Sequence, residues 1–173
     1  MNNVYLILGS NIEKEQNLPT AVALLRDRVD VVAVSSVYET RPVGLAAQPN
    51  FWNTAVHIQT PLSAAQLKTQ VLAAIEQKLK RVRVADKNAP RTIDLDIVLF
   101  NEAVFDYDGG DGKLRYVPDP DLLKFAHVAV PLAELAPQML HPETAESLQT
   151  IAVRLNSVSI RRLPEVNLNK YDH

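Results

Sequence analysis

The chain has 173 residues, enough for one domain that buries a substantial core. Its formal net charge of -2 and pI of about 6.1 give no reason to expect general binding to nucleic acid or to an anionic membrane. It has no cysteine, which excludes disulfides, zinc–thiolate sites and cysteine nucleophiles, and it shows neither a basic leader nor an apolar run of about 18 residues. We therefore expect a single cytoplasmic domain over residues 1–173.

The first third of the chain alternates strand-like and helical patterns. Residues 4–8 form a short apolar run typical of a buried strand. Residues 19–28 have helical periodicity, and Pro19 is expected near the first turn, where its missing N–H matters little. Residues 31–38 and 51–59 are rich enough in β-branched and apolar side chains to predict two further strands.

The remaining two thirds add a long helix, one core strand and several accessory elements. Ser63 and Gln66 have the spacing of a capping box, and apolar side chains recur at helical intervals from there to about Lys80. The other predicted elements are a strand at 94–100, a hairpin at 104–117 and helices at 125–136 and 147–155. The order β-α-β-β-α-β predicts an α+β, ferredoxin-like sandwich with an added hairpin and C-terminal helices.

The strand predicted at 94–100 carries two carboxylates, Asp94 and Asp96, in an otherwise apolar run. Successive strand side chains alternate between faces, so both aspartates share one face, with Cα atoms roughly 6 to 7 Å apart. Ile93, Leu95 and Ile97 then point into a core. Two acids at this separation suit one or two Mg²⁺ ions and chemistry on phosphates. A half-exposed strand with solvated acids has the same pattern, so the pair alone leaves both interpretations open.

Four cations precede the acidic strand: Arg81, Arg83, Lys87 and Arg91. Guanidinium groups bind phosphate oxygens through parallel hydrogen bonds, so cations beside a carboxylate pair suggest the two halves of a polyphosphate site. A solvated charged loop is the alternative.

Five segments, in this order, resemble the 6-hydroxymethyl-7,8-dihydropterin pyrophosphokinase family of the folate pathway. They are residues 5–11 (YLILGSN), 35–44 (SSVYETRPVG), 48–56 (QPNFWNTAV), the basic and acidic run formed by Arg81, Arg83 and 90–96 (PRTIDLD), and 130–137 (VPLAELAP). One such motif would be weak, but five in order on a chain of this length are a specific signal.

The resemblance implies transfer of pyrophosphate from ATP to 6-hydroxymethyl-7,8-dihydropterin, with AMP as the leaving product. It implies that Asp94 and Asp96 hold Mg²⁺, expected as two ions, and that Arg81 and Arg91 act in catalysis. The ATP-binding set that it implies is Glu76, Arg81, Arg83, Lys87 and Arg91. Glu76 also fits an ordinary helix-face carboxylate, and each arginine fits a solvated surface group.

The resemblance also implies a pterin pocket. Its expected residues are Thr40, Pro42, Val43, Phe51, Asn53 and His127. A flat bicyclic ring needs an aromatic plane, which Phe51 supplies unless it is plain core packing.

Three residues depart from the family pattern. Asp119, Phe125 and His127 stand where the family usually has histidine, arginine and phenylalanine. They leave open a divergent pterin- or nucleotide-binding relative with little catalysis. A ferredoxin-like RNA-binding module is a further alternative, which the net charge of -2 disfavours. We expect a monomer that binds small-molecule substrates and neither nucleic acid nor membrane.

Overall fold

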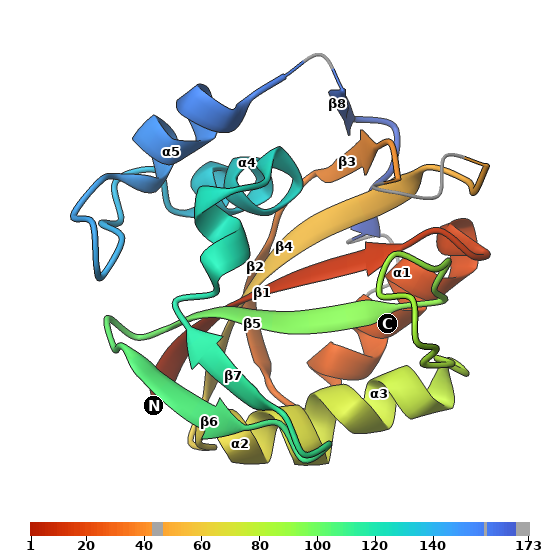
Figure 1. Ribbon diagram of the computed structural model, residues 1–173, viewed down its shortest axis with the longest axis horizontal. Helices are drawn as coiled ribbons and strands as arrows, with labels where there is room; N and C mark the ends of the chain where they lie inside the picture. The colour runs from red at the N-terminus through yellow and green to blue at the C-terminus, as the bar shows by residue number, and fades with distance from the viewer. Residues whose placement is uncertain (43–46, 158, 169–173) are drawn as a thin grey trace.

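The computed structural model describes residues 1–42, 47–157 and 159–168 (Figure 1). The elements are β1 (Asn2–Ser10), α1 (Lys14–Arg26), β2 (Asp30–Val34), β3 (Val37–Thr40), β4 (Phe51–Thr60), α2 (Ala64–Gln66), the π-helical segment η1 (Leu67–Leu72), α3 (Ala73–Lys78), β5 (Asp94–Phe100), β6 (Phe105–Asp108), β7 (Leu114–Val117), the 3₁₀ segment η2 (Pro120–Leu123), α4 (Ala126–Leu135), α5 (Leu148–Leu155) and β8 (Ile160–Leu163). Within these ranges, none of the helices has the length and apolar character needed to cross a membrane.

One antiparallel sheet organises the molecule. Its order is β5-β1-β4-β3-β8, with β2 also paired to β4, and all of these pairs are antiparallel. The last core strand lies beside the first, as the split βαβ pattern requires. The predicted ferredoxin-like α+β fold is therefore confirmed, and β6 and β7 form the predicted additional hairpin.

Two hydrophobic cores cover the two faces of this sheet. Leu6 and Leu8 of β1 pack in one cluster with residues of α1, η1 and α3. Ile7, between them, packs in a second cluster with residues of α4 and α5. Because strand side chains alternate, β1 contributes to both cores, and α4 and α5 lie on the face opposite α1 and α3 (Figure 1).

The single strand predicted at 31–38 is wrong, because the chain forms two strands there, β2 and β3. Ser35 interrupts the pairing with β4: its hydroxyl accepts a hydrogen bond of 2.8 Å from the Ala55 N–H. The side chain thus takes the place of a backbone carbonyl, and the register of β2 shifts near Ala33. A side-chain acceptor of this kind replaces the ladder locally, so the strand divides.

Two helical expectations also need adjustment. The helix predicted at 19–28 begins at Lys14 and ends at Arg26, so Pro19 lies inside it, with its ring buried. The capping box of Ser63 and Gln66 is confirmed, but the helix that follows contains the π-helical segment η1. Strand β8, which pairs with β3, was not predicted, since its four residues become a strand only through that pairing.

Candidate functional site

One row of residues crosses three adjacent strands at the site. Asp94 of β5 lies opposite Gly9 of β1, and Gly9 lies opposite Asn53 of β4. Asp96 occupies the next position on the same face, opposite Ile7. A Cβ atom at Gly9 would lie 3.1 Å from the Asn53 amide oxygen, so glycine keeps this row open.

The two aspartates adopt the predicted strand geometry. Ile93, Leu95 and Ile97 are buried on the opposite face, while the Asp94 and Asp96 side chains keep 20% and 38% of their surface exposed. The shared face expected from the sequence is confirmed, and both carboxylates reach solvent.

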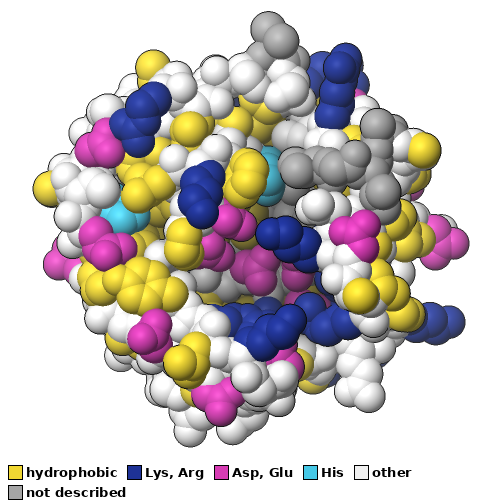
Figure 2. All heavy atoms as spheres, viewed as in Figure 1, with side chains coloured by type: hydrophobic (Ala, Val, Ile, Leu, Met, Phe, Trp, Pro, Cys, Tyr) yellow, Lys and Arg dark blue, Asp and Glu magenta, His cyan; other side chains and the backbone are white. Residues whose placement is uncertain are grey.

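A cavity of about 510 Å³ lies over this part of the sheet. It is lined by Ile7, Gly9, Thr40, Arg41, Phe51, Asn53, Lys87, Asn88, Arg91, Asp94, Asp96, Asp121, Phe125 and His127. Figure 2 shows acidic side chains in a hollow near the middle of this face, with Lys and Arg side chains on several sides. The cavity thus joins an aromatic wall to a carboxylate pair and its neighbouring cations.

The structure brings most of the predicted pterin residues to this cavity. Thr40, Phe51, Asn53 and His127 line it, whereas Pro42 is half-buried and is absent from the lining. Val43 lies outside the described residues. Arg41, Asn88 and Asp121 line the cavity although the sequence did not mark them as ligands, since lining positions on loops and on the short segment η2 carry no periodic signal.

Asn53 is held rigidly at the floor of the cavity. It is 4% exposed, and its amide nitrogen donates to the Thr40 hydroxyl at 2.9 Å and more weakly to the Tyr38 carbonyl at 3.4 Å. With the amide nitrogen engaged, the orientation of the side chain is fixed. The amide oxygen faces Gly9 and is the group that remains to accept from a ligand.

Aromatic side chains lie on two elements around the cavity. Phe125 and His127 stack with ring centroids 5.3 Å apart, and the Arg91 guanidinium lies 5.6 Å from the centre of the Phe51 ring. Burial lowers the pKa of His127, so its imidazole is neutral at pH 7. A planar ligand would therefore meet uncharged aromatic surface from α4 and β4.

Arg91 is fixed by the turn that follows β1. Its backbone N–H donates to the Asn11 side chain at 2.8 Å, and its carbonyl accepts from the Asn11 and Ile12 N–H groups. Asn11 in turn donates to Gln48 and to the Pro49 carbonyl. The Gly-Ser-Asn turn thus locks the basic segment against the loop that leads into β4.

The guanidinium of Arg91 contacts the acidic pair directly. One nitrogen donates to the Asp94 carboxylate at 2.8 Å and another donates to the Lys87 carbonyl. Its third nitrogen, Nε, is buried without a partner among the described residues, as is the Nε of Arg81. The Thr92 hydroxyl is likewise buried without a partner there, and buried polar atoms of this kind are rare in folded proteins.

The two aspartates differ in their electrostatic surroundings. Burial alone would raise the pKa of Asp94, but Arg91, Lys68 and Arg81 outweigh it and lower that pKa. Burial, followed by the neighbouring Asp94 charge, raises the pKa of Asp96 to about 7. One carboxylate is thus ionised at neutral pH, and the other shares its site with a proton.

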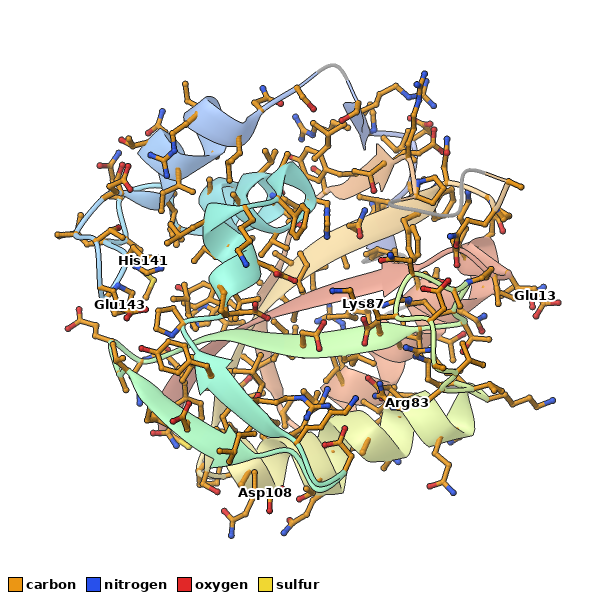
Figure 3. All side chains as sticks on the ribbon, in the orientation of Figure 1. Glu13, Arg83, Lys87, Asp108, His141 and Glu143 are labelled. Carbon is orange, nitrogen blue, oxygen red and sulfur yellow. The ribbon has the colours of Figure 1, made fainter. Side chains whose placement is uncertain are left out.

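A second cavity, of about 480 Å³, lies between the helical run η1–α3 and the β6–β7 hairpin. Its lining is Lys68, Thr69, Ala73, Glu76, Gln77, Arg81, Arg83, Gly109, Gly110, Asp111 and Arg115. Arg81, Arg83 and Glu76 therefore lie here and are absent from the lining of the first cavity, while Lys87 and Arg91 line the first. Figure 3 labels Arg83 toward α3 and Lys87 nearer β5, although both belong to the segment between these elements.

Glu76 is not a solvated helix-face residue. It is 4% exposed, and one carboxylate oxygen accepts from the Leu95 N–H at 3.1 Å while the other accepts from Arg83 at 2.6 Å. Glu76 thus joins the helix to the peptide between the two aspartates. Lys68, also buried, forms an ion pair with Glu76 that was not predicted from the sequence. Its position on the apolar helix face was the available signal.

The three departures from the family pattern have definite places. Asp119 caps η2, its carboxylate accepting from the Asp121 N–H at 2.9 Å, and burial raises its pKa to about 6. It also lines a cavity of about 280 Å³ together with Asp96 and Arg115. Phe125 and His127 stack on each other in the first cavity, as described above.

Residues 5–137 match the family described as 7,8-dihydro-6-hydroxymethylpterin-pyrophosphokinase. A Bacillus subtilis protein, 2-amino-4-hydroxy-6-hydroxymethyldihydropteridine pyrophosphokinase, is 40% identical over 159 residues, which cover 90% of this chain and 91% of the relative. A Pseudomonas aeruginosa protein of the same description is 35% identical over 167 residues, which cover 95% of this chain and 98% of that one.

Solved structures agree on the fold. The wild-type HPPK-DHPS of Plasmodium falciparum superposes with a TM-score of 0.76 at 12% sequence identity. The matched part covers 93% of this chain and 48% of the Plasmodium chain, so the similarity concerns about half of that longer protein.

Proposed function

Because the chain belongs to the 7,8-dihydro-6-hydroxymethylpterin-pyrophosphokinase family and carries that pyrophosphokinase activity in folate biosynthesis, we propose how its two cavities divide the reaction. The substrates are ATP and 6-hydroxymethyl-7,8-dihydropterin. The residue roles, the metal ion and the assembly state given below are our proposal.

The first cavity takes the pterin. Its aromatic surfaces, Phe51 and the Phe125–His127 stack, suit a planar bicyclic ring. The fixed amide of Asn53 and the adjoining Thr40 hydroxyl offer an acceptor and a donor for the ring edge. Pro42 and Val43 stay predictions from the resemblance, because Pro42 is absent from the lining of this cavity and Val43 lies outside the described residues. The carboxylate pair at the far wall then lies where the hydroxymethyl group meets the phosphates.

The ATP phosphates lie between the two cavities. Arg81, Arg83, Lys87 and Arg91 all border one or the other, and two of these arginines have a buried Nε without a partner among the described residues. The guanidinium and ammonium groups would bind phosphate oxygens through charge-assisted hydrogen bonds. Glu76, with its oxygens engaged by Leu95 and Arg83, orients this group from the helix.

The Asp94–Asp96 pair fits a magnesium site. Among the described residues no group of three or more His, Cys, Asp or Glu side chains gathers as a metal cage. Mg²⁺ commonly binds through one or two carboxylates together with water and substrate phosphates, so a pair on an open strand suits it. When bound, Mg²⁺ neutralises charge on the phosphates during displacement, and two ions would use both aspartates.

The reaction is an in-line displacement at the β-phosphorus. The substrate hydroxymethyl oxygen loses its proton to water and forms a bond to that phosphorus as the bond to the α-phosphate oxygen breaks, and AMP leaves with that electron pair. Arg81 and Arg91 stabilise the charge that develops on the phosphate oxygens. Binding both substrates against a rigid sheet supplies the remaining catalysis through orientation.

We also propose that the chain acts as one domain and as a monomer. The exposed large apolar side chains of the described residues are dispersed over separate elements, for example Val32, Val82, Leu114 and Val153. Scattered apolar side chains are usual on monomers, whereas stable interfaces gather them into patches.

The placement of the Asp94–Asp96 pair, between an aromatic pocket and the cations Arg81, Arg83, Lys87 and Arg91, carries this proposal. The test is AMP release from ATP in the presence of 6-hydroxymethyl-7,8-dihydropterin and Mg²⁺. Asp96→Asn should abolish pterin-dependent AMP formation, while Asp106→Asn, on the exposed face of β6, should keep it. Equal activity of Asp96→Asn and wild type would show that the pair does not bind the metal ion. Pterin binding without AMP release by the wild type would favour a divergent binding protein.

A further inference from the structure

Lys68 is a lysine buried in the protein interior. Its exposure is 2%, and it lies in the π-helical segment η1. Burying an ammonium group is unfavourable unless it is paired and hydrogen-bonded. Single π-helical turns within α-helices occur frequently at functional sites. The groups that contact the Lys68 ammonium therefore indicate its role.

The Lys68 ammonium has three partners, two on β5 and one on α3. It donates to the Leu95 carbonyl at 2.7 Å, and it lies 3.7 Å from an oxygen of Glu76 and 3.7 Å from an oxygen of Asp96. Glu76 also accepts from the Leu95 N–H. Strand β5 is at the edge of the sheet, so the N–H and carbonyl of Leu95 that point outward have no neighbouring strand to pair with. Lys68 bonds to that carbonyl and Glu76 to that N–H.

The other cations of the site have more freedom. The Arg91 side chain is 18% exposed and that of Arg83 is 50% exposed, so each can exchange its carboxylate partner for a phosphate. Lys68 is held on three sides and has little access to solvent. Its charge therefore stays beside Asp96 whether or not a substrate is bound.

We propose that Lys68 is a fixed internal cation that sets the metal affinity of the Asp94–Asp96 pair, keeping that affinity low until nucleotide phosphates arrive. This inference rests on the metal role proposed above for the pair. An unscreened positive charge beside Asp96 repels a divalent cation and attracts a polyphosphate. Lys68 acts through Asp96 and Leu95, so it is a positioning residue and not a catalytic one.

Removal of the Lys68 charge should change the affinities for the metal ion and for the nucleotide in opposite directions. Removing the Lys68 charge strengthens binding of a metal ion to the nucleotide-free protein and weakens binding of a nucleotide without metal. A lysine that only supports packing would behave differently, because a loosened β5 would weaken both. The signs of the two shifts therefore distinguish the roles.

The experiment is a titration of the nucleotide-free protein with Mn²⁺, followed by electron paramagnetic resonance at pH 8.5. Lys68→Met should bind Mn²⁺ about tenfold more tightly than the wild type. It should bind a non-hydrolysable ATP analogue several-fold more weakly in EDTA. Lys78→Met removes the same charge from an exposed position on α3 and should match the wild type. Equal or weaker Mn²⁺ binding by Lys68→Met overturns the proposal.

A second pair of variants covers the case in which Lys68→Met does not fold. In Glu76→Gln the amide oxygen can still accept from the Leu95 N–H, and the double variant Lys68→Met/Glu76→Gln removes one buried charge of each sign. The double variant should bind Mn²⁺ about tenfold more tightly than Glu76→Gln alone, and equality of the two overturns the inference. If neither the wild type nor any of these variants binds Mn²⁺, the proposed metal site fails and this inference fails with it.

Discussion

The Arg91 guanidinium donates a hydrogen bond of 2.8 Å to the Asp94 carboxylate. A group proposed to bind phosphate and a group proposed to bind metal thus neutralise each other before either ligand arrives. Binding of a metal–nucleotide complex would separate the pair and give each member a new partner of opposite charge. The exchange would keep the site close to charge balance, which lowers the free-energy cost of assembling the four cations proposed to bind phosphate beside two acids.

Arg91→Lys tests the geometry of this exchange. The lysine keeps the positive charge but loses the planar fork that contacts Asp94 and the Lys87 carbonyl and that would bind a phosphate once Asp94 is released. We expect kcat for AMP formation to fall by about tenfold to a hundredfold, since the lost contacts act on developing charge. Steady-state kinetics with each substrate varied measures this.

Arg154→Lys is the matched control for Arg91→Lys. Arg154 also pairs with a carboxylate, that of Glu146, but it lies on α5 away from both cavities. Its kinetics should equal those of the wild type. A rise in KM for ATP with unchanged kcat in Arg91→Lys would show that Arg91 binds the ground state and the transition state equally.

Metal binding should depend on pH through Asp96. Burial and the Asp94 charge raise the pKa of Asp96 to about 7, and only the ionised carboxylate binds a metal ion. The affinity for Mn²⁺ should therefore be about tenfold weaker at pH 6 than at pH 8, by competition with one proton. Calorimetric titration of the nucleotide-free protein measures it. An affinity that is the same at both pH values would contradict the proton on Asp96.

The same carboxylate should affect the stability of the metal-free protein. Its pKa lies above the unfolded value of 3.8, so the folded state binds more protons between about pH 4 and pH 7, and stability falls as the pH rises through that range. In EDTA at pH 8, Asp96→Asn should raise the free energy of unfolding by about 1 to 2 kcal/mol, a value reduced for solvent screening because the side chain is 38% exposed.

Urea unfolding of both proteins at pH 5 and at pH 8 checks this prediction. At pH 5 Asp96 is protonated, so the two proteins should be nearly equal in stability. A larger advantage for Asp96→Asn at pH 5 than at pH 8 would reverse the sign of the linkage and refute the raised pKa.

Local patterns made the acidic strand and the helix start predictable from the sequence. The alternation from Ile93 to Ile97 needs only the two-residue period of a strand, and it placed both aspartates on one face correctly. The Ser63–Gln66 capping box involves groups three residues apart, so it too is a local property.

Features that depend on distant contacts were not predictable in this way. Ser35 divides its strand because its hydroxyl meets the Ala55 N–H across the sheet. Lys68 sits on the apolar face of its helix, where a lysine commonly extends its ammonium to solvent. Only packing against Leu95 makes it a buried cation. The division of the basic residues between two cavities likewise depends on the path of the chain after α3.

His127 should contribute to pterin binding through its ring and not through charge. It stacks on Phe125 in the first cavity, and burial keeps its pKa low, so it is neutral from pH 7 to pH 8. His127→Ala should weaken binding of 6-hydroxymethylpterin about three- to tenfold, whereas His127→Phe should retain it. His57→Ala removes another stacked imidazole, one that packs on Tyr5 outside the cavity, and should leave pterin binding unchanged. Fluorescence titration at pH 7 and pH 8 measures all three, and equal loss in His127→Phe and His127→Ala would show that the imidazole nitrogens, not the aromatic plane, bind the pterin.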